Sequence, residues 1–199
     1  LGLPVVAVGN RFEDSPCIGI DDFGSTALAA EHLLGLGHRR IAYVGKARPN
    51  ASHRKTPSDR LAGFRHAMTR AGIVTPSSWV FESDWSAGDA NALALDLLSG
   101  SDRPTAVLAA SDEMALGVLG AARRLGLEVP RDLSIVGIDD HDLAAVFGLT
   151  TVRQDVAAQG VAAAQTLLGL LGLVKPELIP EQTFPVELVV RDSTAGPAS

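Results

Sequence analysis

The segment from Leu127 to Asp140 joins a turn, a buried strand and two adjacent carboxylates. Pro130 fixes φ and removes a backbone donor, so a preceding helix must end before it. Asp132 can bond back to the backbone of the turn. The apolar run between positions 133 and 138 is typical of a strand covered on both faces. Asp139 and Asp140 follow it at the carboxyl edge of the predicted sheet, where open α/β sheets bind ligands. The segment therefore predicts an α/β fold with acids at a ligand site.

Strand-like segments recur along the chain with helical patterns between them, and this alternation is typical of parallel βαβ units. The predicted strands are Pro4–Gly9, Cys17–Asp21, Arg40–Gly45, Trp79–Glu82, Thr105–Ala110, Leu133–Ile138, Thr150–Gln154 and Phe184–Val190. The predicted helices are Phe23–Leu34, which Gly37 ends, Ser58–Gly72 with Ser58 as N-cap, Ala87–Leu98, Ser111–Gly126 and Asp155–Leu171.

Composition narrows the class of protein. A chain of 199 residues with 46% hydrophobic content can bury a substantial core. Its net charge of −6 repels phosphate, so we expect that these residues do not hold DNA themselves. The single cysteine, Cys17, cannot form an internal disulfide and fits a small buried hydrophobe in a reducing cytoplasm.

The start of the chain, LGLPVVAVGN, has neither the basic stretch nor the cleavage site of a signal peptide. No apolar run reaches the roughly 18 residues that a membrane span needs. Because the start reads as a buried strand from its first residues, we expect the chain to be a piece of a longer protein.

Polar or aromatic residues lie at the ends of five of the predicted strands. Because the carboxyl ends of parallel strands meet at one edge of a sheet, these residues outline a single crevice. They are the Lys46–Arg60 loop, Asp84 with Trp85, Ser111 with Asp112, Asp139 with Asp140, and Arg153 with Gln154.

Each candidate also has a structural interpretation. Trp85 offers an apolar face to a sugar ring or a base, or it packs in the loop. Arg60, in a first helical turn, opposes the helix dipole, so a carboxylate or a ligand oxygen should offset that cost, unless it is simply an exposed arginine. Ser111 is either an N-cap or a ligand contact. Gln154 is a ligand donor or a polar residue at a hinge. Asp139 contacts a ligand or merely caps the next short helix, with its neighbour solvated.

Catalytic motifs are scarce. The chain has no phosphate-binding GxxxxGK[ST], no GxSxG and no HExxH, and its five histidines show no metal-ligand spacing. The adjacent acids could form an acid–base pair, but neither a nucleophile nor a metal set accompanies them. We therefore predict a binding protein that is not an enzyme, with no catalytic residue, no metal and no cofactor.

Several segments together carry a family signature. They are PVVAVGN, HLLGLGHRRIAYVG, DRLAGFRHAM, DWSAGDA, RPTAVLAASDEMALGVLGAARRLGLEVPRDLSIVGIDD, LTTVRQDVAAQG and ELVVRDST. In this order, over essentially the whole chain, they resemble the effector-binding core of bacterial transcriptional regulators of the LacI/GalR family. The resemblance implies a periplasmic-binding-protein-like fold of two Rossmann-like subdomains that close on a small effector, often a sugar or a nucleobase.

The resemblance also implies how the chain is divided. Residues 1–20 and 154–182 would be part of an amino-terminal subdomain that is only partly present, and residues 21–153 and 183–199 the carboxy-terminal subdomain. The helix-turn-helix domain would lie outside this chain. Operator DNA would therefore be bound through that missing domain, by a cytoplasmic homodimer without membrane contact.

By matching motif positions, Arg60, Trp85, Ser111, Asp139 and Gln154 fall where such regulators place effector contacts. Arg60 and Asp139 would hold hydroxyl or amide groups, Trp85 would stack, and Ser111 and Gln154 would adjust the fit. Three departures from the family pattern concern Gly9, where many relatives carry a longer side chain, Ser111 in place of a frequent Asn, and Phe147 in place of a frequent Pro. The loop KARPNASHRKTPSD is also longer than usual.

We expect the effector to be a mono- or disaccharide, or a phosphorylated derivative if Lys46, Arg48 or Arg54 of the long loop folds over the site. A nucleobase is the second candidate, because it too can stack and pair its edges. The alternative function is a periplasmic-type solute-binding protein for sugar uptake, which shares the fold, and an enzyme on this fold is a more distant third. The residues upstream of Leu1 would separate the first two, because a regulator carries a helix-turn-helix there and a solute-binding protein carries a secretory leader.

Overall fold

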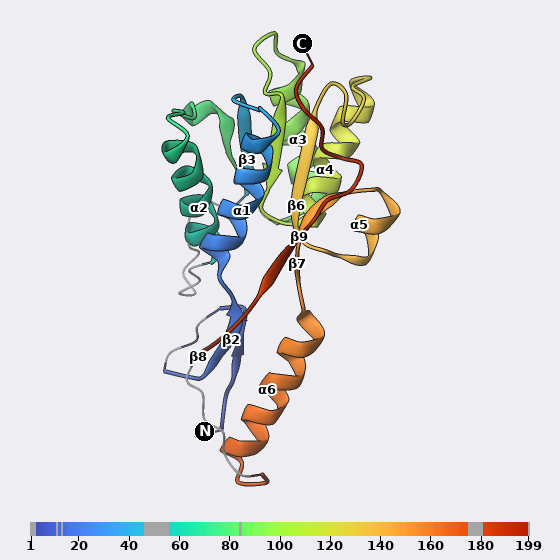
Figure 1. Ribbon diagram of the computed structural model, residues 1–199. Helices are drawn as coiled ribbons and strands as arrows, with labels where there is room; N and C mark the ends of the chain where they lie inside the picture. The colour runs from blue at the N-terminus through green and yellow to red at the C-terminus, as the bar shows by residue number, and fades with distance from the viewer. Residues whose placement is uncertain are drawn as a thin grey trace.

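A computed structural model describes residues 3–10, 12, 14–45, 56–83, 85–174 and 181–198, and its strands form two sheets (Figure 1). The large sheet has the order β4-β3-β5-β6-β7-β9 and the small sheet the order β1-β2-β8. All neighbouring strands run parallel except β7 and β9. The large sheet contains β3 (Ile41–Gly45), β4 (Val80–Glu82), β5 (Ala106–Ala109), β6 (Ser134–Asp139), β7 (Thr150–Gln154) and β9 (Val186–Val189); the small sheet contains β1 (Ala7–Val8), β2 (Cys17–Ile20) and β8 (Glu181–Phe184). The predicted α/β class with mostly parallel sheets is confirmed.

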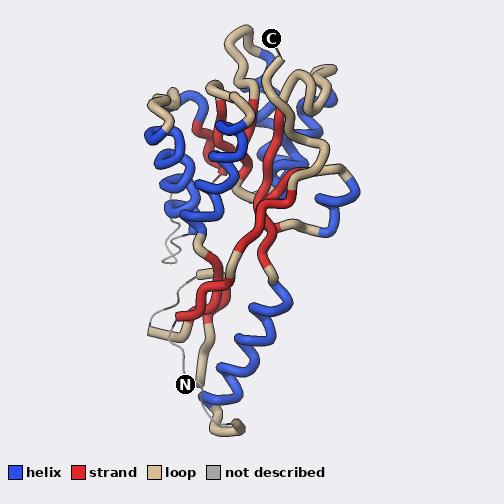
Figure 2. Tube along the Cα trace, in the orientation of Figure 1, coloured by secondary structure: helices blue, strands red, loops and turns tan. Residues whose placement is uncertain are grey.

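Helices cover both faces of the large sheet (Figure 2). The helices α1 (Asp22–Gly35) and α2 (Thr56–Arg70) pack together on one face, and α3 (Ala87–Ser99) and α4 (Asp112–Arg124) pack together on the other. The short helix α5 (Asp142–Val146) follows β6, and a 3₁₀ turn, Ser77–Trp79, precedes β4. The long helix α6 (Val156–Leu170) contacts β1 and β2 and belongs to the small part of the molecule. Among the described residues, no helix is long and apolar enough to cross a membrane.

The core lies around the central strands of the large sheet. Every residue of β3 and β5 is buried, as are the first five residues of β6, which is why these segments read as continuous apolar runs. Tyr43 of β3 packs on Phe64 of α2, with 5.3 Å between ring centroids. Gly117 lets α4 approach α3 closely, because a Cβ there would overlap the carbonyl of Ala87.

The chain passes between the two sheets at three places: between β2 and α1 at Asp21, between β7 and α6 at Asp155, and between β8 and β9 at Pro185. The carboxyl ends of β6 and β7 face this junction, since β7 leads directly into α6 (Figure 1). Side chains that leave those strand ends therefore lie between the large sheet and the small one.

Several local predictions are confirmed. Gly37 takes a positive φ of 100° after α1, and Asp132 accepts a hydrogen bond of 2.8 Å from the backbone of Glu128. Cys17 is buried.

Two predictions about element boundaries are wrong. Thr56, rather than Ser58, begins α2, so Ser58 is not the N-cap. The expected single strand Phe184–Val190 is two strands, because Pro185 separates β8 from β9 and each strand joins a different sheet.

Candidate functional site

The guanidinium of Arg60 is the centre of a buried ion-pair cluster. Arg60 is 5% exposed, and its Nε donates to Asp22 Oδ1 at 2.7 Å. A second guanidinium nitrogen donates to the carbonyl of Ala110, and Nη2 lies 3.5 Å from Asp139 Oδ1. The predicted carboxylate partner of Arg60 is therefore present, and it is Asp22, the first residue of α1.

Burial lowers the pKa of Arg60, but the charges of Asp139 and Asp22 outweigh this effect and hold the pKa above its ordinary value. Arg60 is consequently a cation at physiological pH. Because α2 begins at Thr56, Arg60 lies beyond the first helical turn, and the expected conflict with the helix dipole is weaker than the sequence suggested.

Trp85 contributes the aromatic side of the cluster. The guanidinium carbon of Arg60 lies over the Trp85 ring, 5.6 Å from its centroid, which is a cation–π geometry. Trp85 is half-buried, packs against the core and has a positive φ of 61°. Its packing role is thus real, and its predicted stacking on a ligand stays a prediction.

Asp139 ends β6 with a positive φ of 123°, and its carboxylate is 31% exposed. Gln154 Nε2 donates to Asp139 Oδ1 at 2.7 Å, and Gln159 Nε2 of α6 donates to Gln154 Oε1 at 3.1 Å. Burial raises the pKa of Asp139, while the Arg60 charge and the Gln154 hydrogen bond lower it by less. An ion pair and two hydrogen bonds thus connect Arg60 through the end of the large sheet to α6.

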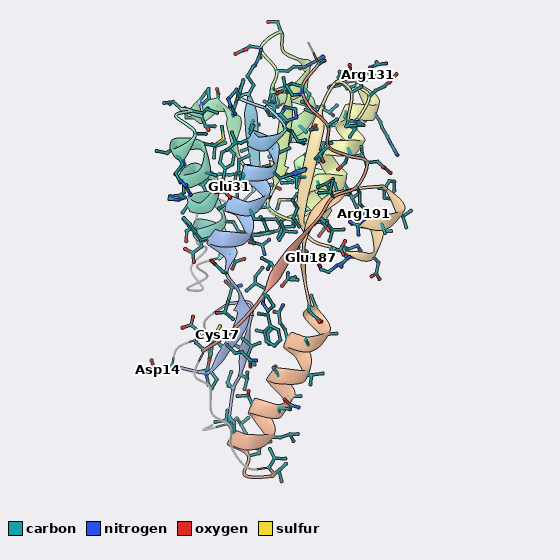
Figure 3. All side chains as sticks on the ribbon, in the orientation of Figure 1. Asp14, Cys17, Glu31, Arg131, Glu187 and Arg191 are labelled. Carbon is teal, nitrogen blue, oxygen red and sulfur yellow. The ribbon has the colours of Figure 1, made fainter. Side chains whose placement is uncertain are left out.

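Asp140, the second acid, pairs with two arginines, Arg153 and Arg191. Its two oxygens accept hydrogen bonds of 2.6 Å from Arg153 and 2.7 Å from Arg191. Burial acts to raise its pKa, but these hydrogen bonds and charges outweigh burial and lower the pKa. Asp140 is therefore not the solvated neighbour that one interpretation of the sequence expected. In Figure 3, Arg191 lies beside α5, and Glu187 lies on β9 toward the junction with the small sheet.

Ser111 caps α4, accepting from the Met114 backbone at 3.3 Å, and it is 6% exposed. The structural interpretation of Ser111 is confirmed, and its contact with an effector stays a prediction. The alternative that Asp139 merely caps α5 is wrong, because His141 is that N-cap and accepts from Leu143 N at 3.2 Å.

A cavity of about 100 Å³ lies at the junction, where Asp22 and Asp59 meet one face of the small sheet. The other lining residues include Gly9, Gly19, Glu181 and Thr183. Asp22 thus connects the Arg60 cluster to this space.

The sequence pointed to Arg60, Trp85, Asp139 and Gln154, and the structure joins them through direct contacts. The sequence analysis did not single out Asp22 or Gln159. Asp22 could have been found from the pair of acids at the end of the second predicted strand. Nothing in the sequence marks Gln159 as a site residue, because a glutamine inside a helix is ordinarily solvated. The loop residues Lys46 to Lys55 and Asp84 lie outside the described residues.

Comparison with known proteins gives the family. The model of the periplasmic binding protein-like domain matches residues 30–194. The HTH-type transcriptional regulator MalR of Streptomyces coelicolor is 40% identical over 206 residues, which cover 98% of this chain and 57% of MalR. A LacI family transcriptional regulator from Mycobacterium smegmatis superposes with a TM-score of 0.86 at 35% identity, over 98% of this chain and 72% of that one. A LacI family transcriptional regulator from Enterococcus faecium with bound ribose gives a TM-score of 0.83 at 29% identity, over 96% of this chain and 70% of that one.

The chain therefore belongs to the family of periplasmic binding protein-like domains. Within that family it is an effector-binding core of the LacI type, which confirms the predicted family and fold. The chain spans 57% of the length of the first curated relatives that it matches.

The Arg60 cluster should be important for stability as well. Replacing Arg60 by Met removes the cation that pairs with Asp22 and Asp139 in a largely buried setting, and breaking such a pair costs about 3–5 kcal/mol. Arg70 provides a matched control on the same helix, because it is 69% exposed and its pair with Glu31, at 3.7 Å, should contribute at most about 1 kcal/mol. Urea unfolding of both Met variants measures the difference. An equal loss of unfolding free energy in the two variants would show that the Arg60 cluster stabilises the fold no more than an exposed ion pair does.

Proposed function

We propose that this chain senses a small effector at the Arg60–Asp139 corner, and that in the longer parent protein this binding changes the affinity for operator DNA. The observation that carries the proposal is the contact between Arg60 and Asp139, with Gln154 bonded to the same carboxylate oxygen. Asp139 and Gln154 lie at strand ends that face the junction between the sheets, which is where α/β folds bind ligands, and Arg60 of α2 reaches Asp139 there.

The chemistry of the corner favours a neutral, many-hydroxyl ligand. Sugar hydroxyls can donate to the partly exposed Asp139 carboxylate. Trp85 supplies an apolar face for the ring. A mono- or disaccharide is thus the preferred effector, and a nucleobase is the second candidate because it can also stack.

The relatives support a regulator over a solute-uptake protein, since the similar curated proteins are transcriptional regulators. The ribose in the Enterococcus faecium structure supports a sugar as the effector class. We infer that the chain acts by binding, without catalysis, and that the parent is cytoplasmic. The division of the chain at residues 20, 153 and 182 into two subdomains that close on the effector is part of the same proposal.

Replacing Asp139 by Ala should weaken effector binding at least about a hundredfold and leave the fold intact, because loss of one buried charged partner commonly costs several kcal/mol. Calorimetry of the intact parent against sugars, sugar phosphates and purines measures the effect. The control is Asp102→Ala, which removes an 85% exposed acid. Purine binding without a sugar response would reject the carbohydrate proposal, and unchanged affinity in the Asp139 variant would remove Asp139 from the site.

The parent should be a twofold dimer, because paired operator half-sites match the symmetry of an isologous dimer. Analytical ultracentrifugation at micromolar concentration measures its association. A parent that stays monomeric with and without DNA would contradict this expectation.

A further inference from the structure

Asp112, the first residue of α4, has a fully buried carboxylate that the proposed site does not use. We propose that Asp112 is a positioning residue that holds the Asp139 carboxylate in the orientation in which it binds the effector. This inference rests on the proposed function, and it assigns Asp112 no contact with the ligand.

Asp112 anchors the two peptide N–H groups that follow Asp139. Its Oδ2 accepts from the backbone N–H of His141 at 2.8 Å, and its Oδ1 accepts from the Thr151 hydroxyl at 2.5 Å. The Thr151 hydroxyl oxygen in turn accepts from the backbone N–H of Asp140 at 3.3 Å. One carboxylate therefore fixes the chain immediately after Asp139, directly at His141 and through Thr151 at Asp140.

The corner needs such anchoring because its backbone is unfavourable. Asp139 has a φ of 123° and Asp140 a φ of 57°, so two successive residues with side chains lie in the region that favours glycine. Such conformations persist only where surrounding contacts enforce them. Without the Asp112 bonds the corner could relax, and the Asp139 side chain would turn away from Arg60 and Gln154.

A simpler role for Asp112 would be to favour the helix dipole from the first turn of α4. The contacts argue for a further role. The cap of α4 is Ser111, which accepts from Met114, whereas both Asp112 oxygens accept from groups outside the helix, on β7 and before α5. The Asp112 side chain is thus bonded to the corner.

The neighbouring strand leaves room for this carboxylate. Gly137 of β6 lies two residues before Asp139, and a Cβ at Gly137 would overlap Asp112 Oδ1. The absence of a side chain at this position is what lets the carboxylate reach Thr151.

The pKa of Asp112 is raised to about 6, mainly because the carboxylate is buried. The hydrogen bonds from Thr151 and His141 act to lower this pKa, and the negative charges of Asp139 and Asp140 act to raise it. Above this pH the carboxylate is ionised, and both oxygens accept hydrogen bonds. The anchoring is therefore intact at pH 7.5.

Amide hydrogen exchange tests the positioning role without any ligand. In both Asp112→Ala and Thr151→Val, amide exchange at Asp140 should become at least about tenfold faster than in the wild type. In Thr151→Val the Asp140 amide loses its acceptor, and in Asp112→Ala the Thr151 hydroxyl that accepts from this amide loses the carboxylate that holds it in place. Exchange at His141 should accelerate similarly in Asp112→Ala. Core amides of β3 and β5 provide the internal reference for global unfolding. Thr151→Val also provides the test if Asp112→Ala does not fold.

Two control variants separate positioning from general destabilisation. Thr151→Ser keeps the hydroxyl and should exchange like the wild type. Ser111→Ala weakens the same end of α4 but should leave the exchange at Asp140 and His141 unchanged relative to the core amides. The proposal is overturned if exchange at Asp140 does not accelerate in Thr151→Val, or if Ser111→Ala accelerates it equally.

Calorimetry of the intact parent with ribose, glucose and maltose tests the consequence for binding. For any of these sugars that binds, Thr151→Val should weaken affinity about tenfold or more, but by less than about threefold when Asp139 is already Ala, because both changes act on one contact. Fully additive losses would overturn positioning through Asp139. If none of the sugars binds the wild type, it is the sugar-sensing function that fails, and hydrogen exchange decides the role of Asp112.

Discussion

The burial of one guanidinium, that of Arg60, is the constraint on which the rest of the site depends. A buried cation loses several kcal/mol of hydration, so it must be surrounded by acceptors. Asp22 at the start of α1, the Ala110 carbonyl after β5 and Asp139 at the end of β6 supply them. A single side chain thus holds three strand-end segments together and fixes the position of the Asp139 carboxylate.

The topology turns this cluster into a connection between the two sheets. The chain crosses between the sheets three times, and one crossing follows Gln154 directly. Gln154 bonds Asp139 on one side and Gln159 of α6 on the other, so the small part of the molecule is linked to the acidic corner by side-chain amides. A ligand that competes for Asp139 would alter the contact next to that crossing, which provides a physical route from effector binding to a change in the relation of the two sheets.

Much of the fold follows from the sequence because the central strands are buried on both faces and therefore read as apolar runs. Edge features were harder to predict. The strand β8 pairs with β2, which is distant in sequence, and only Pro185 marks the change of sheet. In the site, the family motifs and the strand ends identified Arg60 and Asp139. The roles of Asp22, Asp112 and Gln159 arise from side-chain contacts between residues 5 to 39 positions apart in the sequence. Periodicity and capping rules do not report such contacts.

The fluorescence of Trp85 gives the most direct test of the claim that the effector binds at this corner. Trp85 and Trp79 are the two tryptophans of the chain, so a Trp79→Phe variant leaves Trp85 as the single reporter, over the Arg60 guanidinium. We predict a saturable change in Trp85 emission when the effector sugar is added, with a midpoint equal to the calorimetric Kd, and loss of that change in Asp139→Ala at the same concentrations. Calorimetric binding of the sugar with no change in Trp85 emission, or an unaltered titration in Asp139→Ala, would contradict the account.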